Sequence, residues 1–189
     1  MAASKKIAIT NVRVFDGKTL STPITVVIDN GLIGDNQDGA EIIDGLNGVL
    51  IPGLIDCHVH MQTEQDLHQM AFWGVTSALS MGDWPPEKLR PLRGRVGLTD
   101  IRSPGVPATS PGSLHSQMLP LPQEDLVLSQ EDAASFIEKR IAEGVDYIKV
   151  IADMPGPDQA TLNVLVAAAH KRGKKVIAHA AEFKPFAMA

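Results

Sequence analysis

Two histidines separated by one residue, His58 and His60, follow an apolar run that begins at Ile51. The run leaves a Pro-Gly turn and is typical of a buried β-strand. Side chains at positions i and i+2 of a strand point the same way, so both imidazoles would face one point. Two neutral imidazoles form half of a metal site. On its own, such a pair is explained equally well as a chance feature of an exposed strand.

Two further residues that could carry chemistry are Lys149, between Ile148 and Val150, and His179, at the end of a later apolar run. An amine inside an apolar strand is costly unless it is neutralised, paired or used chemically. Burial lowers the pKa of an amine and makes it nucleophilic. Lys149 can then form a Schiff base, or add carbon dioxide to give a carbamate, which is an anionic metal ligand. For His179, a core histidine with satisfied hydrogen bonds is the alternative.

The first part of the chain has the period-two pattern of short strands. Asp-Gly and Asn-Gly separate these stretches, which indicates a β-meander or a small sandwich. We assign residues 1–50 to an N-terminal β-sandwich module, which needs another layer to pack on. The expected strands span residues 7–14, 24–28, 41–44 and 49–50.

After His60 the pattern changes to alternating helices and strands, which predicts parallel strands joined by right-handed crossovers. We expect about five β/α units over residues 51–189, an α/β fold that forms an incomplete (β/α)8 TIM barrel. Residues 84–122, which are rich in proline, are expected to form an ordered loop over a site. The expected helices span 65–73, 129–144, 158–173 and 180–189, and the strands span 51–60, 75–81, 94–98, 146–151 and 175–179.

The composition excludes several classes of protein. The composition, with 44% hydrophobic and 21% charged residues, is typical of a soluble globular chain. The net charge of −5 argues against non-specific nucleic-acid binding. Its single cysteine, Cys57, excludes an intrachain disulfide, and no apolar run approaches the ~18 residues of a membrane span. We expect a cytoplasmic protein with a small-molecule substrate and neither a nucleic-acid nor a membrane partner.

Active sites of (β/α)8 barrels lie at the carboxyl ends of the strands. His58 and His60 on the first strand, Lys149 on the fourth and His179 on the fifth would meet at this end.

The remaining polar candidates have simpler interpretations. We expect an exposed helix face for His68, a helix C-terminus for His170 and a core position for Cys57. A loop position is favoured for His115, with a substrate contact as the alternative, and for Asp153 a turn and a substrate contact are equally supported.

Three motifs together resemble the metal-dependent amidohydrolase superfamily. The first runs from Pro52 to His60 and follows the β-rich residues. Gly144–Val150 and Val176–Ala180 resemble the strand-4 and strand-5 motifs of the superfamily. The match is closest to its imidazolonepropionase- and Xaa-Pro-dipeptidase-like members, and it covers nearly the whole chain.

The resemblance implies a role for each of the four residues. His58 and His60 would bind one metal ion, a carboxylated Lys149 would bridge two, and His179 would bind the second. The resemblance implies a divalent metal cofactor, with Zn²⁺ as the favoured metal and one or two ions bound. It also implies that Lys149 is the catalytic residue. The reaction implied is hydrolysis of a C–N bond in an amide, cyclic amide or peptide, and non-peptide C–N bonds are the favoured class.

The superfamily pattern continues with a strand-6 histidine and a strand-8 aspartate, which have no counterpart in these 189 residues. We therefore interpret the chain as the N-terminal portion of an amidohydrolase, with open barrel edges that would allow a homo-oligomer. The alternative is a non-catalytic fragment that acts by association with another chain. A third hypothesis is a Schiff-base enzyme that uses Lys149.

Overall fold

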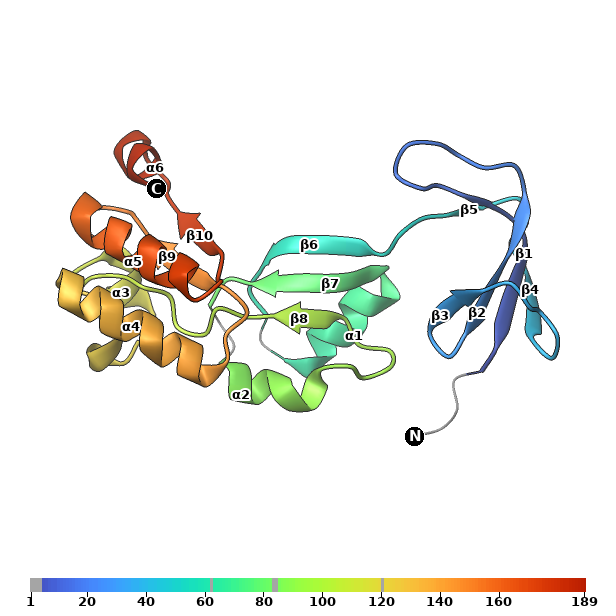
Figure 1. The fold of residues 1–189 in the computed structure, drawn as a ribbon, viewed down its shortest axis with the longest axis horizontal. Helices are drawn as coiled ribbons and strands as arrows, with labels where there is room; N and C mark the ends of the chain where they lie inside the picture. The colour runs from blue at the N-terminus through green and yellow to red at the C-terminus, as the bar shows by residue number, and fades with distance from the viewer. Residues whose placement is uncertain (1–4, 62, 83–84, 120) are drawn as a thin grey trace. The chain divides into compact units, whose positions relative to one another are not determined.

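The computed structural model describes residues 5–61, 63–82, 85–119 and 121–189 of the chain (Figure 1). It divides into two compact units, one up to Gly53 and one from Leu54 onward. In the part of the chain described, no helix is long and apolar enough to cross a membrane.

The first unit is a sheet in which β1 is central. Its strands are β1 (Ile7–Val14), β2 (Ile24–Asp29), β3 (Leu32–Gly34), β4 (Glu41–Asp44) and β5 (Val49–Leu50). β1 pairs antiparallel with β2 and parallel with both β4 and β5, which rules out a simple antiparallel meander. The expected strands all form, and β3 was not predicted. A second layer is not seen in the described part of this unit, so the sandwich stays a prediction.

A bend in β1 explains how it pairs with two strands along one edge. Its register shifts between Ile9 and Val12, and Asn11 between them has a φ of 50°. β4 therefore pairs with the first half of β1 and β5 with the second half. Gly45 lies in the bend, where an added Cβ would come within 2.9 Å of the carbonyl oxygen of Thr10. Only glycine allows this close approach of two backbones.

The second unit alternates parallel strands and helices. Its strands are β6 (Leu54–Val59), β7 (Val75–Ser80), β8 (Asp100–Arg102), β9 (Ile148–Ile151) and β10 (Val176–His179). The helices are α1 (Glu64–Phe72), α2 (Pro86–Leu89), η1 (Arg90–Leu92), α3 (Leu114–Met118), η2 (Gln123–Asp125), α4 (Gln130–Glu143), α5 (Gln159–Lys171) and α6 (Phe183–Met188). β6, β7 and β8 form one parallel sheet and β9 and β10 another, so the unit is α/β as predicted. Closure into a barrel stays a prediction.

Local sequence signals placed α4 and α5 correctly. Ser129 and Asp132 form a capping box at the start of α4, and Gly144 ends it with a φ of 80°. Asp158 caps α5 by accepting a hydrogen bond from the amide of Thr161 at 2.8 Å. These side chains satisfy amide groups that would otherwise lack partners at the helix ends.

Two predictions about strands in this unit are wrong. Residues 94–98 form turns, because Gly94 and Gly97 have φ values of 67° and 83°, and β8 begins only at Asp100. β6 is exposed rather than buried, with Ile55 64% exposed, because among the described residues it pairs only with β7. Cys57 on β6 is exposed as well, so its assignment to the core is wrong.

The two sheets of this unit are joined through residues around β9. Ala108 forms a parallel bridge with Val150, so the chain after β8 runs beside β9. Tyr147, just before β9, donates its hydroxyl hydrogen to the carbonyl oxygen of Ser80, and its oxygen lies 3.2 Å from that of Arg102. Burial raises the pKa of Tyr147 well above its usual value, so this hydroxyl stays protonated. These contacts place the end of β7 next to the start of β9.

We expect Tyr147→Phe to lower the free energy of unfolding by about 1–3 kcal/mol, because the buried carbonyl of Ser80 would lose its donor. Urea denaturation followed by circular dichroism measures this change, and Tyr147→Leu, which also removes ring packing, should cost more. A Phe variant as stable as the wild type would contradict the role of this hydrogen bond.

Candidate functional site

The four residues predicted to carry chemistry lie in the second unit, with His58, His60 and His179 at the carboxyl ends of β6 and β10 and Lys149 within β9. His58 is near the end of β6 and His60 follows it. Their ring centroids are 5.3 Å apart, although the register of β6 against β7 shifts between Asp56 and Val59. The amide of His58 donates to the carboxylate of Asp56 at 3.0 Å, which fixes the backbone at this shift.

Lys149 is in the middle of β9, where all four residues are buried. Its side chain is 4% exposed, and Nζ lies 3.6 Å from the sulfur of Met81, which is buried too. Burial lowers the pKa of Lys149 below its ordinary value, because the charged ammonium loses water. A thioether is a weak acceptor and does not replace that water. Burial in this site therefore shifts Lys149 toward the neutral, nucleophilic amine.

His58 connects the pair on β6 electrostatically to the other two residues. Burial is the largest cause that lowers the pKa of His58, and positive charges on Lys149, His60 and His179 lower it further. The carboxylate of Asp56 acts in the opposite direction. Neutral imidazole is the form that binds metal, so these effects favour the ligand state of His58. The four residues thus influence one another, and their function as ligands stays a prediction.

Two more side chains, His115 and Asp153, contact His179. The ring of His115 lies edge-on to that of His179, with a centroid distance of 4.7 Å. Nε2 of His179 lies 2.9 Å from a carboxylate oxygen of Asp153. Sequence reasoning favoured a loop position for His115, with a substrate contact as the alternative, and supported a turn and a substrate contact equally for Asp153. The structure places both side chains beside His179. The position of Asp153 just after a predicted strand was the available signal, whereas the sequence held no local signal for His115.

Each element that carries these residues is anchored. His115 is on the short helix α3, whose first turn is capped by the hydroxyl of Ser113. Ser113 in turn hydrogen-bonds Thr109 at 2.8 Å, and both hydroxyls are buried. Asp153 accepts a hydrogen bond from the amide of Ala181 at 2.8 Å. The loops after β9 and β10 are therefore tied together at the site.

The other two histidines behave as predicted. His68 is exposed on α1, with Nε2 3.8 Å from Glu64, and His170 is exposed in the last turn of α5.

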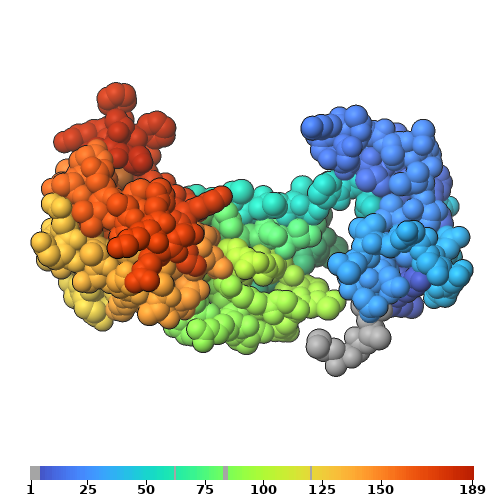
Figure 2. Space-filling view, in the orientation of Figure 1, coloured from blue at the N-terminus to red at the C-terminus, as the bar shows by residue number. Residues whose placement is uncertain are grey.

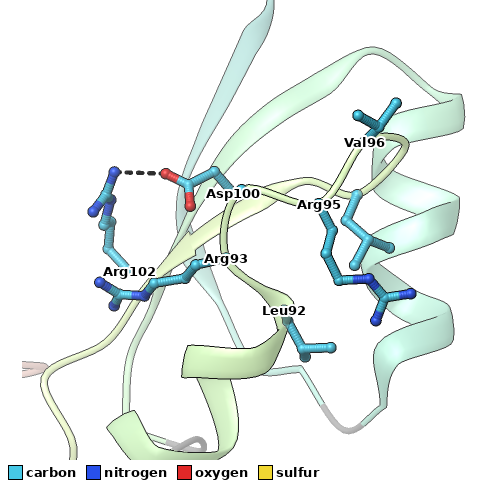
Figure 3. Close-up of a pocket in the computed structure, with 8 residues that line it drawn as sticks. Leu92, Arg93, Arg95, Val96, Asp100 and Arg102 are labelled. Carbon is cyan, nitrogen blue, oxygen red and sulfur yellow. Dashed lines mark hydrogen bonds and ion pairs between the residues drawn. The ribbon is translucent and has the colours of Figure 1, made fainter. Parts of the chain in front are cut away.

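A hollow of about 490 Å³ lies away from these residues, in the segment that enters β8 (Figure 3). It is lined by three arginines, and each has a carboxylate partner. Arg93 pairs with Asp146, Arg95 with Glu64 at 2.7 Å, and Arg102 with Asp100 at 2.6 Å. The charges of the three arginines that line this hollow are therefore compensated within the protein.

The donor set fits a divalent metal. Imidazole nitrogen and carboxylate oxygen are the ligands that Zn²⁺ takes alongside thiolate. One ligand atom from each of His115, Asp153 and His179 lies within 4.8 Å of the other two, among the residues that the structure describes. His58 and His60 add a second pair of nitrogens near Lys149.

We expect Lys149→Met to raise the stability of metal-free protein at pH 7, with a gain that shrinks toward pH 10. The unfolded lysine titrates near 10.4, and the folded-state pKa is lower, so between the two values the unfolded chain binds more protons. Wild-type stability therefore rises with pH over this interval, and the Met variant lacks the effect. Denaturation in buffers depleted of carbon dioxide measures it, with exposed Lys171→Met as the control. A difference independent of pH would contradict the buried amine.

Comparison with solved structures shows what fold the chain has. A Xaa-Pro dipeptidase with methionine bound in its active site is 20% identical, with a TM-score of 0.74 over 98% of this chain and 59% of that one. An amidohydrolase is 19% identical, with a TM-score of 0.75 over 98% and 58%. A. niger ochratoxinase is 16% identical, with a TM-score of 0.73 over 98% and 58%.

No family model and no curated protein matches the sequence. The chain covers less than two thirds of each of these three structures. Over nearly its whole length, the protein has an amidohydrolase-like fold.

Proposed function

We propose that this chain carries metal-binding residues of a hydrolase that acts on C–N bonds of a small molecule. The observation that supports the proposal is the electrostatic influence of His60, His179 and the buried Lys149 on His58, within an amidohydrolase-like fold. Histidines alone are common on protein surfaces. A buried amine beside them needs a chemical or structural reason, and metal ligation through a carbamate supplies one.

The protein residues would divide the work as follows. His58 and His60 bind one ion as neutral imidazoles, and the lowered pKa of His58 favours that form. In its neutral form, which burial favours, the amine of Lys149 would add to the carbon of carbon dioxide and lose a proton to water, leaving a carbamate whose two oxygens share one negative charge. His179 holds the second ion. Zn²⁺ bound there would supply Lewis acidity toward a substrate carbonyl and would acidify water.

The similarity to a Xaa-Pro dipeptidase and an amidohydrolase supports an amide, cyclic amide or peptide as the substrate class. Among these, we favour non-peptide C–N bonds, as the sequence resemblance implies. Because the chain spans 59% of the dipeptidase structure, the full activity of such an enzyme is part of the proposal.

A second candidate function is association with another chain, and exposed apolar side chains favour it. Ile55 on β6 is 64% exposed and Phe183 on α6 is 89% exposed. Figure 2 shows the segment around α6, in dark red, standing out from the surface of its unit. Apolar surfaces of this kind mark interaction sites in soluble proteins. A second copy of the chain is the simplest partner, through the open edges of β6 and β10.

Metal content tests the first function. Purified wild-type protein should retain zinc after dialysis, and His58→Ala with His60→Ala should remove at least one ion per chain, because both nitrogens of that site are lost. Plasma mass spectrometry measures the content. His68→Ala with His170→Ala, two exposed histidines, is the matched control and should retain the wild-type value. Full occupancy in the His58/His60 variant would show that these residues do not bind the metal.

Sedimentation tests the second function. We expect the wild type to form dimers or larger species at micromolar concentration, and Ile55→Lys with Phe183→Lys to shift it toward the monomer, because charges on exposed apolar surface oppose association. A wild-type chain that is monodisperse, monomeric and melts cooperatively would argue against association.

A further inference from the structure

We infer that His115, Asp153 and His179 together bind one divalent metal ion, with Zn²⁺ as the ion that fits best. The inference deepens the proposed function and rests on it for the presence of a resident metal. It assigns two ligands, His115 and Asp153, that the sequence motifs do not contain. The ion held by His179 would then be coordinated from within this chain.

The distances between the three side chains are close to those that zinc requires. Zinc lies about 2.0–2.2 Å from nitrogen and oxygen ligands, so ligand atoms around a tetrahedral ion are about 3.4 Å apart. The three ligand atoms here all lie within 4.8 Å of one another. His179 and Asp153, at 2.9 Å, are already in contact, as expected when a shared proton takes the place of a metal. Small side-chain rotations would therefore complete the site.

Asp153 is oriented for this role by its second oxygen. Oδ1 accepts a hydrogen bond from the amide of Ala181 at 2.8 Å, and Oδ2 faces Nε2 of His179. The carboxylate is thus fixed between the loop after β9 and the loop after β10. Hydrogen bonds that hold a ligand in this way are a regular part of metal sites.

His115 has a buried ring nitrogen that lacks a partner. Nδ1 of His115 is buried and makes no hydrogen bond in the described part of the chain. A buried polar atom left unsatisfied is costly, which indicates that something absent from the protein binds this imidazole. The start of its helix, α3, is anchored by the buried Thr109–Ser113 hydrogen bond.

These three side chains leave a fourth position around a tetrahedral ion, which an oxygen of a Lys149 carbamate or a water molecule would take. The pKa of His115 is lowered mainly by burial and then by the positive charge of His179, and this favours the neutral ligand form. The competing explanation is an ion pair between protonated His179 and Asp153, with the His115 ring edge-on beside it and no metal bound.

Cobalt binding distinguishes the two explanations. The full chain with His58→Ala and His60→Ala serves as the background, so that the other metal position is removed. Co²⁺ titration followed by visible absorption, and Zn²⁺ titration by calorimetry, should show one ion bound per chain. Adding Asp153→Asn or His115→Gln should weaken binding at least about 100-fold, because losing a ligand costs more than losing a residue that orients one.

Asp153→Asn has nearly the same shape as the wild-type side chain, and its side-chain oxygen can still accept the hydrogen bond from the amide of Ala181. His170→Gln, on the exposed end of α5, is the control and should bind like the background. Circular dichroism and melting temperature of the metal-free variants report the fold.

Two results would overturn the inference. One is a background that binds no Co²⁺. The other is Asp153→Asn and His115→Gln variants that bind as tightly as the background while folded. Neither result bears on the proposal that His58 and His60 bind a metal ion. If that proposal were wrong, the wild type and the background would have the same metal content. The two proposals can therefore fail separately.

Discussion

The candidate site depends on the hydrogen bonds that hold β9 between its neighbours. The backbone carbonyl of Lys149 accepts a hydrogen bond from the amide of Ala108 at 2.8 Å, and the amide of Ile148 donates one to the backbone carbonyl of Lys175 at 2.9 Å. All four residues of β9 are buried, and α4 and α5 pack next to it around one apolar core. Because the strand is paired on both edges, the backbone of Lys149 is held within the unit, and its side chain is buried there. This burial lowers the pKa of the amine.

The same pairing brings the other candidate ligands together. The chain after Ala108 leads into α3 and its His115, and β10 on the other edge ends at His179. Asp153 follows β9 itself and joins the two sides through His179 and Ala181. His115 and His179, which are 64 positions apart in the sequence (179 − 115), thus meet at one edge. Such convergence at the carboxyl ends of parallel strands is how α/β folds build sites from several loops.

This arrangement explains which parts of the site were predictable. His58, His60, Lys149 and His179 lie in or directly after strands, so the expectation of a barrel was enough to predict that they meet at one end. Capping residues and a strand lysine are signals local to the sequence. His115 could not be found in this way, because its position depends on how a proline-rich segment folds beside β9. The exposure of β6 also depends on what packs against the strand, which its apolar composition does not reveal.

Burial differs sharply between the strands that carry the candidate ligands. Lys149 lies on the fixed strand β9, whereas His58 lies on β6, which is exposed along most of its length. Local stability follows the number of buried contacts, so β6 is expected to open more readily than β9. A metal that binds the folded state and not the open one stabilises the folded state by mass action. If an ion connects the imidazoles of β6 to a carbamate on β9, its binding energy acts where packing is weakest. The buried amine of Lys149, which costs stability in the metal-free chain, would then help to hold β6 in place through the ion.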